Sequence, residues 1–410
     1  MTISTCSGNV YTYLQQTNEI VGGVAEPNNF VWTFEPFQKF FELPNVDTYI
    51  ISITEQCNLR CSYCCYSGDY KNNRKHNTSS MSTQDIDEVF EYIQVHRKMD
   101  SLKIAFYGGE PLTNFSTLRH AIMRARTIWG TVVEISVSTN GVLLTKDRIE
   151  WFVGQYVRLD ISIDGGQYTH DGQRQDASGN GSFEKVHAAI SYLKEKYPDY
   201  LHDNVLLLMT LVSLSALEQV AEEWQKDAIL KDLYPTKISN LLPNFAKGVP
   251  YIDYEDLVVR YIRLLGIYET HRDWRVLKVF FEQCVSYWIN RPIINVDGSI
   301  PMSTCLPKTS KLFIDCKKQI SVCEKFCDKY PIGDVCEGVD WDIANHLVAD
   351  YYNKRKDRCS TCAAVRMCNL CLTAVEYSDK EWDILCHNER MYTKICFRIF
   401  CEMAERGLLG

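Results

Sequence analysis

The sequence lacks both a basic excess and a long apolar run. Its 410 residues carry 44 Lys and Arg against 52 Asp and Glu, a formal net charge of −8. This balance argues against the positive field with which proteins bind a nucleic-acid backbone. No run of about 18 apolar residues is present, so we expect no membrane span. The first ten residues show no basic segment followed by an apolar stretch. We therefore expect no secretory signal and a cytoplasmic protein.

Cysteine is absent from one long stretch, Tyr66 to Gln283, and abundant on either side of it. Of the 18 cysteines, four lie at 57, 61, 64 and 65, and thirteen more fall between Cys284 and Cys401. In a reducing compartment disulfides are disfavoured, and clustered thiols usually hold metal. The sequence therefore predicts two metal-binding regions that flank a thiol-free core.

The thiol-free core alternates segments typical of buried strands with segments typical of amphipathic helices. The strands are aliphatic and β-branched runs, as in a parallel sheet covered on both faces, and we expect them at residues 48–54, 102–107, 132–138, 158–163, 204–212 and 237–242. We expect helices at residues 82–97, 115–129, 146–155, 182–196, 214–225 and 254–268. The first helix opens with the cap signature of Ser82 and Asp85. Six units are too few for a closed eight-unit barrel. The prediction is an α/β fold, a partial (β/α)6 TIM-like barrel with its active site at the carboxyl ends of the strands.

The first cysteine group follows the first predicted strand with the spacing C-x3-C-x2-C, at Cys57, Cys61 and Cys64. Three thiolates on one short loop can hold three corners of a [4Fe–4S] cluster and leave the fourth iron open. A zinc knuckle or a group of unligated thiols is the alternative. The spacing, with the aromatic Tyr63 inside it, resembles the radical S-adenosylmethionine (SAM) superfamily. We interpret the adjacent Cys65 as a packed thiol.

Motifs after the later strands resemble those of radical SAM peptide and protein maturases, in the same order. The resemblance implies that SAM is contacted by Tyr63, Gly108, Gly109, Glu110, Ser138, Asn140, Ser162, Asp164 and Arg174. Taken alone, Gly-Gly-Glu is a common turn, and Arg174 can be a surface ion pair worth under about 1 kcal/mol. His170 and Asp171 can be turn residues. No catalytic base is identified.

The second cysteine region has the spacing C-x2-C-x5-C-x2-C followed by a later cysteine, which resembles the SPASM domain of radical SAM peptide maturases. The resemblance implies two auxiliary [4Fe–4S] clusters. One would use Cys359, Cys362, Cys368 and Cys386, and the other Cys284, Cys305 and Cys371. The second set lacks a fourth ligand, for which Cys316, Cys323, Cys327 and Cys336 are candidates. These four could also bind a separate metal, or the cluster could stay open for a substrate. Structural zinc is the rival for all such sites.

The resemblance also implies a domain organisation. We expect an N-terminal extension at residues 1–45, the radical SAM barrel at 46–245 and a helical linker at 246–283. The SPASM domain follows at 284–390 and a C-terminal helix at 391–410.

The implied function is reductive cleavage of SAM and abstraction of hydrogen from a ribosomally made precursor peptide, to install a carbon–carbon, carbon–oxygen or thioether cross-link. The implied partners are that peptide and a reductant such as flavodoxin or ferredoxin. Because only about 45 residues precede the first strand, we expect the leader of the peptide to be bound either by a separate leader-binding protein or by the barrel and the C-terminal module.

Three alternatives stay open, the last of which is a radical SAM enzyme that acts on tRNA or a small molecule and is disfavoured by the acidic charge and the C-terminal module. The first is an anaerobic sulfatase maturase that forms formylglycine. It is weakened because Leu306 stands where that group places an aspartate. The second is a non-catalytic iron–sulfur or zinc adaptor, which the intact motifs disfavour.

Overall fold

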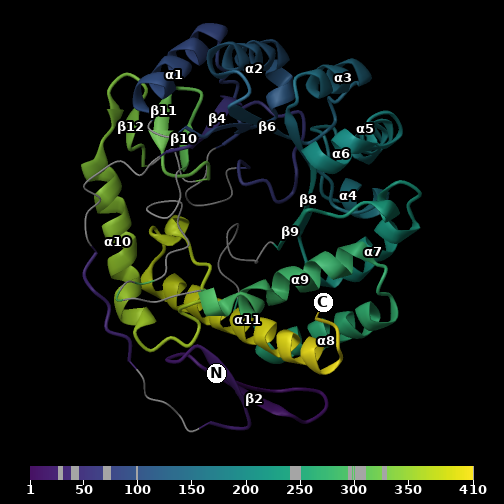
Figure 1. Cartoon of the computed structure of the whole chain (residues 1–410), viewed down its shortest axis with the longest axis vertical. Coiled ribbons are helices and arrows are strands. Elements are labelled where there is room, and N and C mark those ends of the chain that lie inside the picture. Colours follow the sequence, from purple (N-terminus) through teal and green to yellow (C-terminus); the bar gives the residue numbers. More distant parts are fainter. Residues whose placement is uncertain are drawn as a thin grey trace. The chain divides into compact units, whose positions relative to one another are not determined.

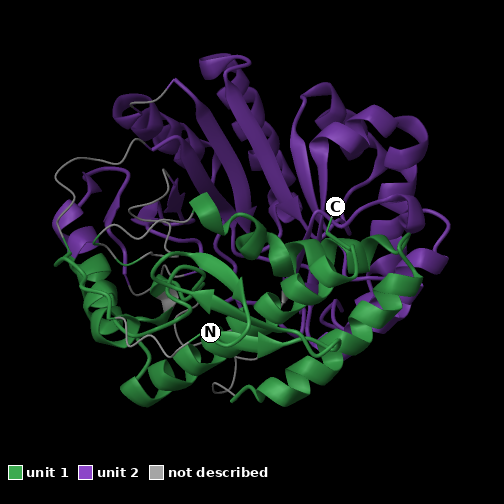
Figure 2. Cartoon of the chain, turned by 60° about the horizontal axis from the view of Figure 1, so that its bottom comes forward, with its two compact units in different colours: residues 1–39, 248–304, 346–410 green, residues 40–247, 305–345 purple. Residues whose placement is uncertain are grey.

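The computed structural model of the chain describes residues 1–25, 31–37, 46–67, 75–97, 100–240, 251–293, 298, 300, 311–325 and 330–409. The chain forms two compact units that interleave along the sequence (Figure 2). Unit 1 comprises residues 1–39, 248–304 and 346–410, and unit 2 comprises residues 40–247 and 305–345. Among the described helices, none is both long and apolar enough to cross a membrane.

Unit 2 contains a sheet whose parallel part confirms the strand predictions. Strands lie side by side in sequence order, each parallel to the next: β4 (Thr48–Thr54), β5 (Leu102–Gly108), β6 (Val133–Thr139), β7 (Arg158–Ser162), β8 (Val205–Leu211) and β9 (Lys237–Asn240). Aliphatic runs pair in this way because both faces of a parallel sheet are covered; Ile51, Ile104 and Val137 are fully buried. The α/β fold is confirmed, and closure of the sheet into a partial barrel stays a prediction.

Helices alternate with these strands, and α1, α2 and α3 lie together along one side of the strands in Figure 1. The longer ones are α1 (Thr83–His96), α2 (Phe115–Trp129), α3 (Lys146–Gly154), α5 (Phe183–Lys196) and α7 (Leu217–Lys226). Short helical turns are η1 (Pro111–Asn114), α4 (Gln167–Asp171), α6 (Pro198–Asn204), η2 (Leu214–Ala216) and η3 (Leu230–Asp232). The cap of α1 is the predicted one: the Asp85 N–H donates to Ser82 Oγ at 3.2 Å, and the Ser82 N–H donates to the Asp85 carboxylate at 2.8 Å.

The helix predicted over residues 214–225 is divided into two parts in the structure, the turn η2 and the helix α7. The reason is local. The Ser213 hydroxyl accepts a hydrogen bond from the Ser215 N–H at 3.1 Å, which favours a tight turn before the helix begins.

Four strands of this sheet lie outside the sequence prediction: β10 (Lys311–Ile314), β11 (Gln319–Ser321), β12 (Gly333–Asp334) and β13 (Gly338–Val339). Strand β10 pairs parallel with β4, and β11 to β13 continue the sheet as antiparallel neighbours. Strands β10 to β13 therefore extend a sheet whose first parallel strand begins at Thr48, 263 residues before Lys311. These strands have only two to four residues each, which is too short to show the alternation of apolar and polar residues, or the longer apolar run, by which strands are recognised in a sequence.

Unit 1 combines a small antiparallel sheet with helices. The sheet has β1 (Thr2–Ser4), β2 (Val10–Leu14) and β3 (Glu19–Gly22), and the helical elements are α8 (Tyr254–Thr270), α9 (Arg275–Ile289), η4 (Arg291–Ile293), η5 (Leu372–Ala374) and α11 (Asp379–Glu405). Helix α10 (Trp341–Cys359) begins in unit 2 and continues in unit 1. An aromatic core joins the sheet to α9 and α11, because the Trp288 ring lies 4.9 Å from Tyr13 and 4.5 Å from Phe397 between centroids.

The C-terminal helix predicted over residues 391–410 is observed only as far as Glu405, as the second half of α11, which begins at Asp379 behind a capping box of Ser378 and Glu381. Helix α8 confirms the helix predicted over residues 254–268.

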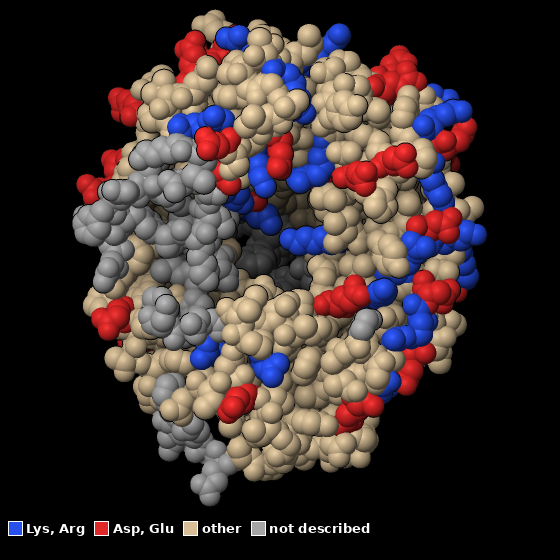
Figure 3. Space-filling view, in the orientation of Figure 1, with Lys and Arg blue, Asp and Glu red and all other residues tan. Residues whose placement is uncertain are grey.

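Charges of both signs are interspersed over the face of the molecule in Figure 3, and no single basic patch covers that face. This distribution agrees with the net charge of −8.

Candidate active site

The loop that follows β4 carries the first three cysteines at the carboxyl end of the strand. This loop is fixed by backbone bonds to a later segment: the Arg60 N–H donates to the Gln175 carbonyl at 2.6 Å, and the Ser62 N–H donates to the Gln173 carbonyl at 3.0 Å. A turn bond from the Cys64 N–H to the Cys61 carbonyl, 3.0 Å long, brings those two residues together. The cysteine loop is thus held in one conformation by a segment more than a hundred residues later in the chain.

The three thiols lie close enough to influence one another. Burial raises the pKa of Cys57 to about 12, and the charges of Glu110, Cys61 and Cys64 add to the rise. Burial also raises the pKa of Cys61 to about 11. The pKa of Cys64 is raised first by a hydrogen bond with Cys65 and then by burial. The thiols are therefore protonated in the protein alone, and iron must displace the protons to bind. Three thiols on one short loop are the kind of donor set that binds a [4Fe–4S] cluster. In the described part of the chain, no three His, Cys, Asp or Glu side chains are placed closely enough to hold a metal ion. The cluster at this loop therefore stays a prediction from the cysteine spacing.

Each of the three sulfur atoms has a nitrogen-bearing side chain next to it from a different part of the fold. The nitrogen–sulfur distances are 3.8 Å for Asn140 Nδ2 and Cys57, 4.0 Å for Arg174 Nη1 and Cys61, and 3.4 Å for His76 Nε2 and Cys64. Hydrogen bonds to cluster sulfurs are one of the terms that set a cluster's reduction potential. The sequence analysis missed His76, and no motif in the sequence marks it.

The paired glycines after β5 allow the chain to approach the start of the cysteine loop. A Cβ at Gly108, whose φ is +128°, would lie 2.4 Å from the Thr54 carbonyl oxygen. A Cβ at Gly109 would lie 2.1 Å from the Gln56 carbonyl oxygen. Real Cβ contacts are never this short, so both positions need glycine. The Gly-Gly pair therefore has a packing role at this site.

Glu110 is buried at the carboxyl end of β5. Its carboxylate accepts hydrogen bonds from the Asn140 N–H at 2.6 Å, from the Thr139 hydroxyl at 2.7 Å and from the Leu112 N–H at 3.1 Å. Burial raises the pKa of Glu110, and these bonds oppose the rise. A carboxylate has about four lone-pair sites. The arrangement leaves acceptor capacity for one further donor.

Arg174 forms a buried ion pair rather than the surface pair that the sequence left open. Its Nε lies 2.6 Å from the Asp164 carboxylate, and the two side chains are 8% and 1% exposed. The same carboxylate accepts hydrogen bonds from the Tyr63 hydroxyl and from the Thr210 N–H, the latter at 2.8 Å. This network joins the cysteine loop to the ends of β7 and β8.

His170 and Asp171 hold the segment that carries Arg174. The His170 Nδ1 accepts from the Asp164 N–H at 3.2 Å, and its Nε2 lies 3.0 Å from the Ser182 hydroxyl. The Asp171 carboxylate accepts from the Ser182 N–H at 2.7 Å and from the Phe183 N–H at 2.8 Å. The Asp171 carboxylate is occupied by two backbone N–H groups, and the His170 ring by one backbone N–H group and the Ser182 hydroxyl.

Ser138 and Ser162 stand near the carboxyl ends of the neighbouring strands β6 and β7. The Ser138 hydroxyl donates to the Asp160 carboxylate at 3.4 Å. A cavity of about 490 Å³ opens at the ends of β7 and β8, and Asp164, Gln173 and Thr210 contribute to its lining, whereas Ser138 and Ser162 do not. Its volume falls in the range of small-molecule sites.

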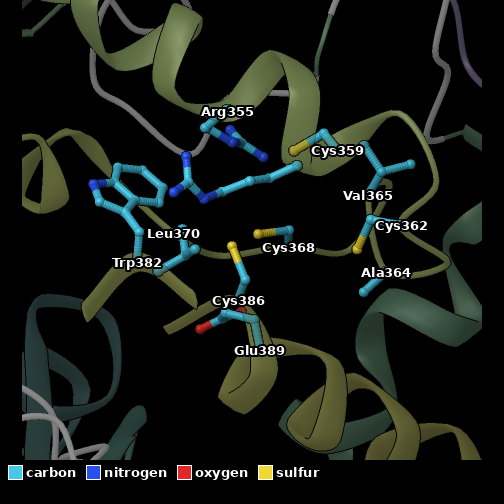
Figure 4. Close-up of a pocket in the computed structure, with 11 residues that line it drawn as sticks. Arg355, Cys359, Cys362, Ala364, Val365, Cys368, Leu370, Trp382, Cys386 and Glu389 are labelled. Carbon is cyan, nitrogen blue, oxygen red and sulfur yellow. The ribbon is translucent and has the colours of Figure 1, made fainter. Parts of the chain in front are cut away.

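Four cysteines of unit 1 lie round one space (Figure 4). Cys359 ends α10, Cys362 and Cys368 lie on the chain that follows it, and Cys386 lies on α11. Burial raises the pKa of Cys386 to about 11, with the charges of Cys359 and Cys362 as further causes. The structure brings together the four residues that the sequence grouped, and adds the side chain of Arg355 to them.

The second predicted set is only partly described. Cys305 and Cys327 lie outside the described residues. Cys284 lies in the core of α8, α9 and α11, where its thiol forms a hydrogen bond with Cys396. Cys371 lies at the start of η5. The partnership of Cys284, Cys305 and Cys371 stays a prediction.

Three of the four candidate fourth ligands, Cys316, Cys323 and Cys336, are described, and all three belong to unit 2. In unit 2 the Cys316 thiol donates to the Ser52 carbonyl at 3.0 Å, the Cys323 sulfur lies 3.7 Å from the Glu324 carboxylate, and Cys336 is exposed.

Residues 51–222 match the family model described as the Radical SAM superfamily. The chain therefore carries a radical SAM domain, which extends from β4 to α7. Enzymes of this superfamily use a [4Fe–4S] cluster and SAM.

Curated relatives match part of the chain. It is 28% identical over 176 residues to the cysteine-type anaerobic sulfatase-maturating enzyme of Clostridium novyi, covering 42% of this chain and 46% of that protein. It is 33% identical over 144 residues to the serine-type enzyme of Bacteroides thetaiotaomicron, covering 34% of each protein. The chain thus spans less than half the length of either relative.

Two solved structures share the fold. Native anSMEcpe with bound AdoMet aligns with a TM-score of 0.63 at 18% identity, over 88% of this chain and 98% of that one. Streptococcus suis SuiB bound to the precursor peptide SuiA aligns with a TM-score of 0.53 at 14% identity, over 82% and 74%.

Proposed function

We propose that this protein is a radical SAM enzyme that abstracts hydrogen from a ribosomally made precursor peptide and installs a carbon–carbon, carbon–oxygen or thioether cross-link. The observation that carries the proposal is the position of the loop with Cys57, Cys61 and Cys64, at the carboxyl end of a parallel strand and within reach of Asn140 and of Arg174, which is paired with Asp164. Parallel α/β folds place their active sites at this edge of the sheet.

When bound, a reduced [4Fe–4S] cluster supplies the electron that cleaves SAM to methionine and a 5′-deoxyadenosyl radical, which removes hydrogen from the substrate. Cys57, Cys61 and Cys64 would hold the cluster. Glu110 would accept a bond from the SAM ammonium group, because a carboxylate with three donors keeps capacity for a fourth.

Other residues at this edge would fix the SAM molecule and the loop. Ser138, Asn140 and Ser162 would contact it from the strand ends. Tyr63, Asp164 and Arg174 would hold the cysteine loop against β7, since Tyr63 and Arg174 share the Asp164 carboxylate. Gly108 and Gly109 would keep the backbone close to the loop. The cavity beside Asp164 offers space for a bound molecule.

The C-terminal cysteines would hold auxiliary clusters, one on Cys359, Cys362, Cys368 and Cys386 and another on Cys284, Cys305, Cys371 and a further ligand. The first assignment is supported by the common space that its four thiols line. The chemistry that a cluster held by these thiols would supply is one-electron transfer. The predicted domain limits, with the radical SAM barrel at 46–245 and the SPASM domain at 284–390, belong to the same proposal.

A peptide substrate is supported by several relatives. The names of two curated relatives state that they mature sulfatases, and the SuiB structure contains a precursor peptide. A third relative, 27% identical over 153 residues, is the radical SAM cyclopropyl synthase TigE of Paramaledivibacter caminithermalis. We propose a flavodoxin or ferredoxin as reductant and a separate protein that binds the leader of the peptide.

A second candidate function is the maturation of a sulfatase by forming formylglycine, which the two sulfatase-maturating relatives favour. Leu306, the residue that weakens this candidate, lies outside the described residues. A sulfatase-derived peptide with Cys or Ser at its centre distinguishes the two candidates. A formylglycine product has a carbonyl that reacts with hydrazides, whereas a cross-link only removes hydrogen from the peptide mass.

The main test is anaerobic purification of the full chain, followed by assays of iron and of SAM cleavage. We expect more than one [4Fe–4S] cluster per chain and formation of 5′-deoxyadenosine with dithionite. Zinc in place of iron, or no nucleoside product from an iron-loaded protein, would falsify the enzyme proposal and favour an adaptor.

A further inference from the structure

A buried arginine lies at the four-thiol space of unit 1. Arg355 is 1% exposed and stands on α10, one helical turn before Cys359. Its side chain forms a hydrogen bond with Cys359, and the charge of Cys368 acts on it as well. Figure 4 shows the Arg355 side chain beside Cys359, among the residues that line the space.

The position of Arg355 is fixed by a second residue of the same helix. Arg355 Nη1 donates to the Tyr351 hydroxyl at 3.0 Å, and its Cζ lies 5.3 Å from the centre of the Tyr351 ring. The Tyr351 hydroxyl donates in turn to the Leu370 carbonyl, on the chain between Cys368 and Cys371. Tyr351, Arg355 and Cys359 follow one another at intervals of four residues, so they lie on one face of α10.

A guanidinium stays charged in a protein, and a buried charge is costly unless groups of opposite sign or hydrogen bonds compensate it. Thiolates bound to iron would supply negative charge at this space. Glu389 also lines the space, and its carboxylate accepts from the Asn369 N–H at 3.0 Å. Reduction adds one more negative charge to a cluster. A cation at short range in a medium of low dielectric constant therefore stabilises the reduced form.

We propose that Arg355 is a positioning residue that raises the reduction potential of an auxiliary cluster held by Cys359, Cys362, Cys368 and Cys386. The proposal rests on the proposed function, because it requires iron at these thiols. With Arg355 beside it, a cluster in this pocket would accept an electron more readily than the same cluster without the buried charge.

The chain offers a matched control three residues away. Arg358 lies on the same helix and also contributes to the lining of the space. Its side chain is 25% exposed and is paired with Asp379 at 3.0 Å and with Asp383 at 3.2 Å. Carboxylates and solvent screen that charge, so Arg358 should affect the cluster less.

The experiment is a redox titration of the full-length, anaerobically reconstituted protein, followed by electron paramagnetic resonance. The signal that disappears in Cys386→Ala identifies the cluster. We expect Arg355→Gln to lower the ratio of reduced to oxidised cluster, at a fixed potential, on the order of tenfold, which is about 59 mV for one electron. Arg358→Gln should change the ratio less than about threefold. Arg355→Lys should stay near the wild type, because the negative charge of the adjoining cluster and its thiolates keeps a lysine at this position protonated.

The proposal is overturned if Arg355→Gln loads iron fully and leaves the ratio unchanged, or if both glutamine variants shift it equally. Should Arg355→Gln fail to load iron, Arg355→Lys decides: a loaded lysine variant within about threefold of the wild-type ratio supports the charge role, and a tenfold change or failure to load overturns it. Failure of the proposed function has a different signature. In that case no Cys386-dependent signal is present in the wild type, or zinc replaces iron.

Discussion

The two thiol sites are assembled in opposite ways. In unit 2, the three thiols come from one loop of eight residues, Cys57 to Cys64, and their neighbours His76, Asn140 and Arg174 come from separate parts of the unit. In unit 1, the four thiols come from α10, the chain after it and α11, while Arg355 stands four residues from Cys359.

The charges of the two sites differ as well. The guanidinium of Arg174 lies 2.6 Å from the Asp164 carboxylate, which offsets its charge, and 4.0 Å from the Cys61 sulfur. The guanidinium of Arg355 forms its hydrogen bonds with Tyr351 and Cys359. A loop with three thiols leaves one iron open for chemistry, and a pocket with four thiols closes the cluster. This difference agrees with our proposal that the loop is the site of chemistry and the pocket a site of electron transfer.

The largest effect should come from removing a loop thiol. Cys61→Ala should lower SAM cleavage by more than about 100-fold, because it removes a direct ligand and not merely an outer partner. Iron at the pocket should persist, and iron content with 5′-deoxyadenosine formation measures both. The exposed Cys6→Ala is the control. Cleavage that survives in Cys61→Ala would refute the assignment of the loop.

The converse change is Cys359→Ala. We expect loss of iron from the pocket and loss of peptide modification, whereas SAM cleavage at the loop continues because its ligands are untouched. Mass spectrometry of a precursor peptide encoded beside this protein, with a nucleoside assay, separates the two outcomes. Simultaneous loss of cleavage would show that the two sites are not independent.

Breaking the buried ion pair should destabilise unit 2. Asp164→Ala leaves Arg174 without its carboxylate in a buried position, which costs about 3–5 kcal/mol of unfolding free energy. Chemical denaturation measures this. The matched control is Glu222→Ala, which removes an exposed helical pair with Lys226 and should cost under about 0.5 kcal/mol. Equal losses in the two variants would contradict the role of the buried network.

Gly109→Ala should disturb the loop site and spare the pocket. The new Cβ would stand 2.1 Å from the Gln56 carbonyl oxygen, so the backbone must move, at a cost of about 1–3 kcal/mol. We expect less iron at the loop in the purified variant. Gly154→Ala is the control, because nothing lies within 4 Å of its added Cβ. Normal iron loading in Gly109→Ala would show that the close approach is dispensable.

The smallest effect concerns His76. Its Nε2 lies 3.4 Å from the Cys64 sulfur, so a bound thiolate would accept a hydrogen bond from the imidazole. His76→Phe keeps a ring and removes the donor, and should lower the fraction of reduced loop cluster by roughly threefold at a fixed potential. His76→Gln keeps a donor and should restore part of the ratio. If the wild type, His76→Phe and His76→Gln gave identical redox titrations, His76 would have no influence on the loop cluster.

Much of the fold could be predicted from the sequence, because each parallel strand is a continuous aliphatic and β-branched run that differs in composition from its surroundings. The segment 48–54 was predicted and observed with the same limits. Strands β10 to β13 were missed, because a strand of two to four residues carries no period of its own. Strands β1 to β3 were missed as well. Helix α11 was recognised only in its second half, since its capping box lies upstream of the predicted start.

The sequence by itself determined the spacing of Cys57, Cys61 and Cys64, from which the cluster loop is predicted. Local spacing carries this information because residues so close along the chain stay close in space in any fold. Tertiary structure alone decided what surrounds them. His76 at Cys64, Asp164 at Arg174 and Cys386 at Cys359 are contacts between segments that no local pattern links. Such contacts follow from the burial of strands and helices against one another, which depends on the whole chain.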